Sequence, residues 1–331
     1  MWFVALVLLL GPAFQHTPPA HPKKSSDLPR TTVLVASSAK RLGIPFFNFY
    51  GQAKQDAGGN VYFHAATRRY SDSSIIRIPY GDSEPKAYSL PEKPARETAF
   101  IAFDVAPSGR VYVLSENADH RSIVFEFGGD GDISSRTELG IPPSARVASM
   151  SVFEATGNFF VLGYYDSSAP DDLRGKTFMA LTSPDGKVFR DLKNSRAIDL
   201  NTLGEKPLTL CSYVGEDGNL YVLASDEILV LTASGDFMRR IKLRKPDDAA
   251  LTTKLIVSQG LAAVWLQSDS AVGKAVELTL ETVDIGTGRV VGVYSASDEL
   301  GDNAVTFSRS EGFVFLRNDG GKVSLLTAHI R

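Results

Sequence analysis

Pro107-Ser-Gly109-Arg-Val-Tyr-Val113 is one of six copies of a short motif that recurs along this chain of 331 residues. Each copy has a turn residue, then a glycine, and then a run of largely apolar residues. The other five copies are Asp56-Ala-Gly-Gly59-Asn-Val-Tyr-Phe63, Ala155-Thr-Gly157-Asn-Phe-Phe-Val161, Glu216-Asp-Gly218-Asn-Leu-Tyr-Val222, Ser258-Gln-Gly260-Leu-Ala-Ala-Val-Trp265 and Ser310-Glu-Gly312-Phe-Val-Phe-Leu316. A glycine just before such a run is typical of a tight hairpin that leads into a half-buried strand.

The six glycines follow one another at intervals of 50, 48, 61, 42 and 52 residues. Strand-forming repeats of roughly 40–50 residues are the signature of a β-propeller, in which each repeat forms one blade. The sequence therefore predicts an all-β protein, a six-bladed β-propeller with four-stranded antiparallel blades over residues 32–331.

The second repeat shows the expected blade most clearly. Its alternating runs predict strands over 100–105, 110–115, 122–127 and 133–139, with glycine turns after the first and third of them. Similar second turns precede the predicted outer strands of later blades, at Pro184-Asp-Gly186, Ala233-Ser-Gly235 and Gly286-Thr-Gly288.

The sixth repeat has only three predicted strands, over 303–308, 312–317 and 322–328. The strand-like run Thr31-Thr-Val-Leu-Val-Ala36 has no blade of its own. A ring of sheets is stable only if its first and last members join, because an unpaired sheet edge is costly. We therefore expect the N-terminal run, about residues 31–37, to complete the last blade.

The N-terminus resembles a targeting segment. Residues 1–10 are an apolar run followed by Gly11, Pro12 and Ala13, which predicts a secretory signal peptide over residues 1–15. The run is shorter than the roughly 20 apolar residues of a membrane-spanning helix, although an uncleaved anchor is the alternative. Residues 16–31 are rich in proline and polar residues and predict a disordered tether.

Composition limits the compartment and the partners. The net charge of −3 and the absence of a basic patch argue against nucleic acid as a partner. The single cysteine, Cys211, lies in an apolar run and is interpreted as a small buried side chain. No disulfide can form within the chain and no Asn-x-Ser/Thr acceptor occurs, which suits a secreted or periplasmic protein of a bacterial envelope. We expect a monomer with no stable membrane insertion once the signal peptide is removed.

The motif Asp/Glu-x-x-Gly-Asn-Val-Tyr-Val, with its downstream glycine turn, resembles the NHL-type and gluconolactonase-like (TolB-like) superfamily of six-bladed propellers over nearly all of residues 32–331. The resemblance implies the fold and says little about activity, because turn glycines and apolar residues carry it. The gluconolactonase-like family holds a divalent cation at the channel mouth through acidic and Asn ligands. By position, Glu97 and Asn303 would match such ligands, with Ca²⁺ or another divalent cation as cofactor; the plainer interpretation is a surface carboxylate and a strand-edge amide.

The loops between second and third strands hold the candidate ligand-binding residues. In propellers these loops share one face with the connections between blades, and ligands usually bind there. Three such loops are rich in aromatic and charged side chains, which supply binding energy at interfaces. The candidates are Arg68, Arg69 and Tyr70 in the first loop, Glu116 and His120 in the second, and Tyr164, Tyr165 and Asp166 in the third.

Two functions from different classes follow. The first is an exported, non-catalytic scaffold that binds a protein, peptide or glycan on its loop-rich face and needs no cofactor. The alternative is a lactonase- or lyase-type hydrolase with a divalent cation in the central channel, where the metal would act as a Lewis acid. Acidic, Asn or His side chains that converge on the channel would favour the hydrolase.

Overall fold

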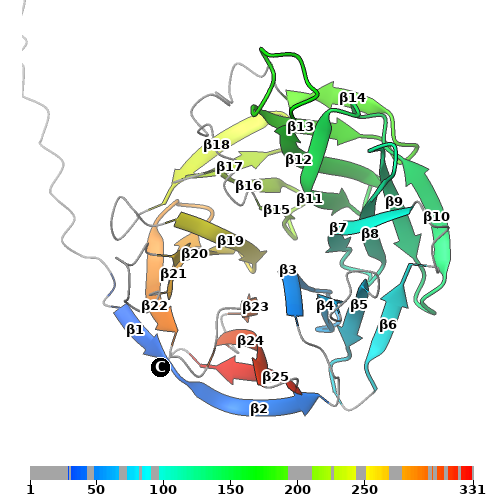
Figure 1. Cartoon of the computed structure of the whole chain (residues 1–331). Coiled ribbons are helices and arrows are strands. Elements are labelled where there is room, and N and C mark those ends of the chain that lie inside the picture. Colours follow the sequence, from blue (N-terminus) through cyan, green and yellow to red (C-terminus); the bar gives the residue numbers. More distant parts are fainter. Residues whose placement is uncertain are drawn as a thin grey trace, which may run out of the picture.

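The computed structural model describes residues 29, 31–42, 48–66, 73–81, 84–90, 97–192, 211–224, 227–243, 251–267, 278–296, 300, 304–308, 312–319 and 322–329. In this part of the chain every regular element is a β-strand. The strands form six sheets arranged in a ring, so the protein is a six-bladed β-propeller, as predicted (Figure 1). The predicted signal peptide and most of the predicted tether lie outside the described residues.

Each blade is a run of antiparallel strands that begins at the centre of the ring and ends at its outside. Blade one has β3 (Asn48–Gln55), β4 (Val61–Ala66), β5 (Ser73–Ile78) and β6 (Lys86–Ser89), and blade two has β7 (Glu97–Val105), β8 (Val111–Asn117), β9 (Ser122–Phe127) and β10 (Ile133–Glu138). Blade three has β11 (Ala145–Phe153), β12 (Asn158–Tyr165), β13 (Thr177–Thr182) and β14 (Val188–Asp191), and blade four has β15 (Ser212–Val214), β16 (Leu220–Ala224), β17 (Glu227–Leu231) and β18 (Phe237–Lys242).

Blades five and six meet where the ring closes. Blade five has β19 (Leu251–Ser258), β20 (Leu261–Gln267), β21 (Leu278–Asp284) and β22 (Val290–Ala296), and blade six has β23 (Ala304–Ser308), β24 (Gly312–Asp319) and β25 (Lys322–Ala328). The N-terminal segment supplies the missing outer strand of blade six, as predicted, through β2 (Ala36–Leu42), which pairs antiparallel with β25.

The strand that closes the ring starts later than predicted. Residues Thr31–Leu34 form a separate strand, β1, which pairs in parallel with β22 and adds a fifth strand to blade five (Figure 1). Leu34 is fully buried between blades five and six, while Val33 and Val35 remain exposed. The apolar run therefore fastens two blades together, and the polar residues after it form the closing strand.

The glycine of each repeat has a positive φ angle, which explains why glycine recurs there. The φ angles are 80° at Gly59, 85° at Gly109, 70° at Gly157, 73° at Gly218, 72° at Gly260 and 79° at Gly312. Side chains rarely adopt this left-handed conformation, whereas glycine adopts it without a steric penalty. The repeated glycine is thus a requirement of the turn between the first two strands of a blade.

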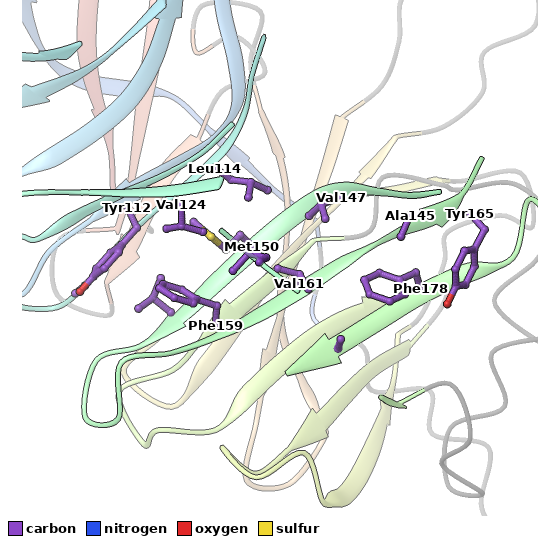
Figure 2. Close-up of a cluster of buried hydrophobic side chains, with 14 of the residues drawn as sticks. Tyr112, Leu114, Val124, Ala145, Val147, Met150, Phe159, Val161, Tyr165 and Phe178 are labelled. Atoms are coloured by element: carbon purple, nitrogen blue, oxygen red, sulfur yellow. The ribbon is translucent and has the colours of Figure 1, made fainter. Parts of the chain in front are cut away.

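Among the residues that the structure describes, the core consists of six apolar clusters, one between each pair of neighbouring blades. In β8, Tyr112 and Leu114 face blade three, whereas Val111 and Val113 face blade one. Figure 2 shows the cluster between blades two and three, where Tyr112 approaches Phe159 with ring centroids 6.0 Å apart. Because side chains of a strand alternate between the two faces of a sheet, each blade buries apolar residues on both sides.

Candidate functional site

A cavity of about 660 Å³ lies at one end of the ring's central axis. All six innermost strands contribute to it, through Gln55, Asp104, Val152, Tyr213, Val257 and Thr306. Ligand pockets are typically roughly 300–1,000 Å³ in volume, so the cavity has the size of a binding site. Its position on the axis means that no single blade forms it.

The cavity opens where the repeat turns meet. Its wall includes the turn residues Ala57, Pro107 and Ala155, each of which follows an innermost strand. Since neighbouring strands of a blade are antiparallel, the loops between second and third strands lie at the opposite end of the ring. The cavity and the loops that carry the predicted binding residues are therefore on opposite faces.

A buried ion pair lies beside the cavity. The Nζ of Lys54, in β3, is 2.9 Å from Oδ1 of Asp104, in β7, and both side chains are less than 10 % exposed. The backbone N–H of Val152, in β11, donates to Oδ2 of Asp104 at 2.8 Å. The same ammonium group lies 4.6 Å from the centre of the Tyr213 ring, in β15. Lys54 and Asp104 thus connect four blades. Lys54 lies in blade one and Asp104 in blade two, and they contact Tyr213 of blade four and Val152 of blade three.

The phenol and the thiol near this ion pair stay protonated at neutral pH. Burial, together with the charges of Asp104 and Glu216, raises the pKa of Tyr213 well above its ordinary value of 10.0. Burial raises the pKa of the Cys211 thiol to about 11, which disfavours the nucleophilic thiolate. This agrees with the interpretation of Cys211 as an apolar side chain.

Short polar contacts hold neighbouring innermost strands together. The hydroxyls of Ser151 and Ser212 lie 2.7 Å apart and join blades three and four. The hydroxyl of Thr306 donates to Oε1 of Gln55 at 2.6 Å and joins blade six to blade one. These contacts fix the strands that form the cavity wall.

Four carboxylates line the cavity: Asp56, Asp104, Glu154 and Glu216. Asp56 is fixed by its own repeat, since it accepts from the backbone N–H of Asn60 at 2.9 Å and from the hydroxyl of Tyr62 at 2.8 Å. Glu154 and Glu216 have longer contacts. Glu154 accepts from the Ser108 N–H at 3.3 Å and Glu216 from the Gln259 N–H at 3.5 Å.

Several predicted loop residues come together on the opposite face. Oε1 of Glu116 lies 2.6 Å from Nδ1 of His120 and 3.4 Å from the guanidinium of Arg146, which also pairs with Asp166. Hydrogen bonds from Ser168, with the charge of Arg146, lower the pKa of Asp166 below its ordinary value. These residues form an ionic bridge between blades two and three.

The other residues predicted to bind a ligand or a metal do not come together in one site among the described residues. Tyr165 is buried against Phe178, with ring centroids 5.5 Å apart, so it belongs to the core, whereas Tyr164 is half-buried. Glu97 begins β7, at the end of the strand away from the cavity, and the backbone alone of this residue is described. Arg68, Arg69, Tyr70 and Asn303 lie outside the described residues.

Lys54, Asp104, Tyr213 and Arg146 were not among the residues predicted from the sequence. A charged residue inside an apolar innermost strand was the available signal for Asp104, which lies between Phe103 and Val105. For Arg146 the available signal was its position, since it is the second residue of its innermost strand, close to the place that Glu97 has in β7.

The carboxylates around the cavity do not form a metal-binding group. Among the described residues, no three His, Cys, Asp or Glu side chains are grouped so as to hold a metal ion. The described part of the chain also lacks any helix with the length and apolar character needed to cross a membrane.

Comparison with known proteins supports the fold. No protein-family model and no curated protein matches the chain. One similar solved structure is a protein of unknown function from Bacteroides caccae, with 17 % identity, a TM-score of 0.51, and coverage of 80 % of this chain and 95 % of that one. Another is the Neurospora crassa Pan2 WD40 domain, with 8 % identity, a TM-score of 0.51, and coverage of 91 % and 98 %.

A third similar structure is a luciferin-regenerating enzyme, with 8 % identity, a TM-score of 0.52, and coverage of 88 % of this chain and 97 % of that one. At these identities the likeness shows the propeller fold alone. A propeller of this kind is consistent with a binding scaffold, and the similar structures include an enzyme and a protein of unknown function.

Proposed function

We propose that the protein is an exported, non-catalytic β-propeller that binds an extended segment of a partner protein at the cavity on the repeat-turn face. It would act as a monomer in a bacterial envelope, within the NHL-type and gluconolactonase-like group that its repeats resemble. The cavity is the observation that supports this proposal, because it lies on the axis of the ring and is lined by residues of all six blades.

The construction of the cavity favours binding without large rearrangement. Its wall is formed by strand ends that hydrogen bonds and an ion pair join across blades. A preformed site loses less conformational entropy when a ligand binds. Apolar side chains such as Val105, Phe153 and Val257 alternate with polar groups in the wall, as in most ligand pockets.

A display library of random peptides, selected on the immobilised protein, tests the proposal. The exposed turn residue Ala155 lines the cavity, so Ala155→Trp should obstruct it without disturbing the core. The matched control is Ser167→Trp, an exposed loop position of the same blade at the other end of the ring. We expect selected peptides to bind Ala155→Trp about ten-fold or more weakly and Ser167→Trp normally. Equal binding by wild type and Ala155→Trp would refute a site at the cavity.

The hydrolase alternative predicts a different response. A cation held near Glu97 would lie at the start of an innermost strand, at the end away from the cavity. Thermal melts with EDTA and then with Ca²⁺, Mg²⁺, Mn²⁺ or Zn²⁺ test for it, because a ligand of the folded state raises the midpoint. A rise that survives Ala155→Trp and is lost in Glu97→Gln would favour the hydrolase.

A further inference from the structure

The charged side chains among the described lining residues all carry the same sign of charge. They are the carboxylates of Asp56, Asp104, Glu154 and Glu216, and no Lys, Arg or His is among the described lining residues. Asp104 is neutralised by Lys54, and Glu154 shares Arg110 with Glu126. Asp56 and Glu216 form no side-chain ion pair in the described part of the chain, so the cavity retains a negative charge.

This charge acts on Tyr213, a phenol in the cavity wall. The pKa of Tyr213 is raised by burial first and then by the carboxylates of Asp104 and Glu216. The negative charges of two blades, two and four, thus act on the same phenol. A cation placed near that point would be stabilised by the same field, more strongly than in open solvent.

The protein already holds one cation in this environment. The Lys54 ammonium lies 2.9 Å from Asp104 and 4.6 Å from the centre of the Tyr213 ring. A carboxylate and an aromatic face are the two partners that bind ammonium and guanidinium groups in proteins. The contact of Lys54 with Asp104 and Tyr213 shows that residues of the cavity wall can bind an ammonium group.

Two of the lining carboxylates, Glu216 and Glu154, have only long contacts and can accept further hydrogen bonds from a second cation. Glu216 is exposed, and its contacts with Ser258 and Gln259 are both 3.5 Å long. Glu154 is about one quarter exposed and its contacts are 3.3 and 3.5 Å. A carboxylate has about four lone-pair sites, so each can accept further hydrogen bonds. They follow the innermost strands of neighbouring blades, three and four.

A metal ion fits this arrangement poorly. Asp56 and Asp104 are already held by Tyr62 and Lys54, and no three potential ligands are grouped in the described part of the chain. An arginine or lysine side chain fits better. Its apolar stem can lie along Pro107 and Val214, while its charged group reaches the carboxylates of Glu154 and Glu216.

We propose that the cavity binds an arginine or lysine side chain of the partner segment, with Glu216 and Glu154 as its anionic partners. This inference rests on the proposed function, because it names the chemistry of the ligand for the same cavity. Arginine should bind better than lysine, since its planar guanidinium can donate two hydrogen bonds to one carboxylate at once.

The test uses four fluorescein-labelled Gly/Ser peptides that differ at two central positions, which hold arginine, lysine, citrulline or glutamate. Fluorescence anisotropy measures their affinity for the full chain. We expect the arginine peptide to bind about ten-fold more tightly than the neutral citrulline peptide, because charge-assisted hydrogen bonds are the stronger ones. The glutamate peptide should not bind, and added salt should weaken the arginine complex.

Variants of the protein assign the effect to named residues. Glu216→Gln should weaken the arginine peptide about five- to ten-fold and leave the citrulline peptide unchanged. Asp171→Asn is the matched control, since it removes one exposed carboxylate on the loop at the opposite face. Equal affinities for arginine and citrulline peptides, or equal losses in both variants, would refute the inference. So would a melting temperature that Ca²⁺ raises in wild type and not in Glu216→Gln.

The failure of this inference differs from the failure of the proposed function. If selected library peptides lose affinity in Ala155→Trp but contain no excess of arginine or lysine, the cavity is a binding site for another chemistry. If no selected peptide depends on Ala155, the cavity is not the binding site and both proposals fail.

Discussion

Lys54 and Asp104 form an ion pair of 2.9 Å between the innermost strands of blades one and two. Oδ2 of the same carboxylate accepts the backbone N–H of Val152 from blade three, at 2.8 Å. The pair is therefore part of the ring's inner wall as well as of the cavity, and its removal should affect both stability and the shape of the site.

Breaking this pair from one side should be costly. Lys54→Met leaves the carboxylate of Asp104 buried without its cation, so the free energy of unfolding should fall by about 3–5 kcal/mol. In Lys54→Met/Asp104→Asn no charge remains, and the amide oxygen can still accept from Val152. The double variant should therefore lose much less than the sum of the two single variants. Urea unfolding of all four proteins measures the coupling, and additive losses would show that the pair contributes nothing.

Substitution of two repeat glycines, Gly109 and Gly218, distinguishes the cost of a side chain at positive φ from the cost of a steric clash with neighbouring residues. An added Cβ at Gly109 would lie 3.0 Å from Oδ2 of Asp56 and 3.2 Å from the hydroxyl of Tyr62, whereas at Gly218 it would meet nothing within 4 Å. Both residues have positive φ. Gly218→Ala should cost about 1–2 kcal/mol for the left-handed conformation alone.

Gly109→Ala should cost more than Gly218→Ala, because it also disturbs the hydrogen bond between Tyr62 and Asp56. Denaturant unfolding of both variants gives the difference. Equal losses would mean that the Asp56 side chain moves away freely, and Tyr62→Phe then serves as a second measure of that hydrogen bond.

The fold could be predicted because its signals are local. A glycine with positive φ and an alternating apolar run lie within a few residues of each other, and each blade repeats them. The start of the closing strand was less accessible to prediction. Residues 31–36 have strand-forming composition throughout, and only the packing of Leu34 between two blades decides that the first four residues pair with blade five.

The site could not be predicted in the same way, because its residues are contributed one by one by different blades. Lys54 and Asp104 are partners across blades, and no local spacing joins them. The loops at the other face were predicted to bind a ligand because they contain aromatic and charged residues, yet Tyr165 in one of them belongs to the core. Composition of a loop does not report whether its side chains face solvent or a neighbouring blade.

Stability should fall at mildly acidic pH because of His64. This residue is buried and stacked on Phe100, with ring centroids 3.8 Å apart, and burial lowers its pKa from 6.5 to about 4. Between these two values the unfolded chain binds a proton that the folded protein does not. The free energy of unfolding should therefore be constant for this group above pH 6.5 and should decrease as the pH falls toward 4, by about 1.4 kcal/mol for each pH unit.

The variant His64→Phe isolates this contribution, since it keeps an aromatic ring beside Phe100 and removes the titrating group. Its unfolding free energy should depend less on pH between 6.5 and 4 than that of the wild type. His329→Asn is the control, because it removes a histidine whose side chain is exposed. An unchanged slope in His64→Phe would assign the acid sensitivity to carboxylates instead.

The two N-terminal strands should contribute differently to ring closure. Removal of residues 1–35 takes away β1 and the buried Leu34, while β2 still pairs with β25. Removal of residues 1–42 exposes the whole edge of β25. The shorter truncation should lower the melting temperature but keep a cooperative transition, and Leu34→Ala in the full chain should cost about 2–5 kcal/mol.

The longer truncation should lose cooperative unfolding, because an open ring leaves blade six without its outer strand. A synthetic peptide of residues 31–42 should restore the transition, with a midpoint that rises with the logarithm of the peptide concentration, since it binds only the folded protein. A peptide of the same composition in scrambled order provides the control. If the longer truncation melted like the full chain, β2 would be dispensable and the ring would be held together by the interactions between blades alone.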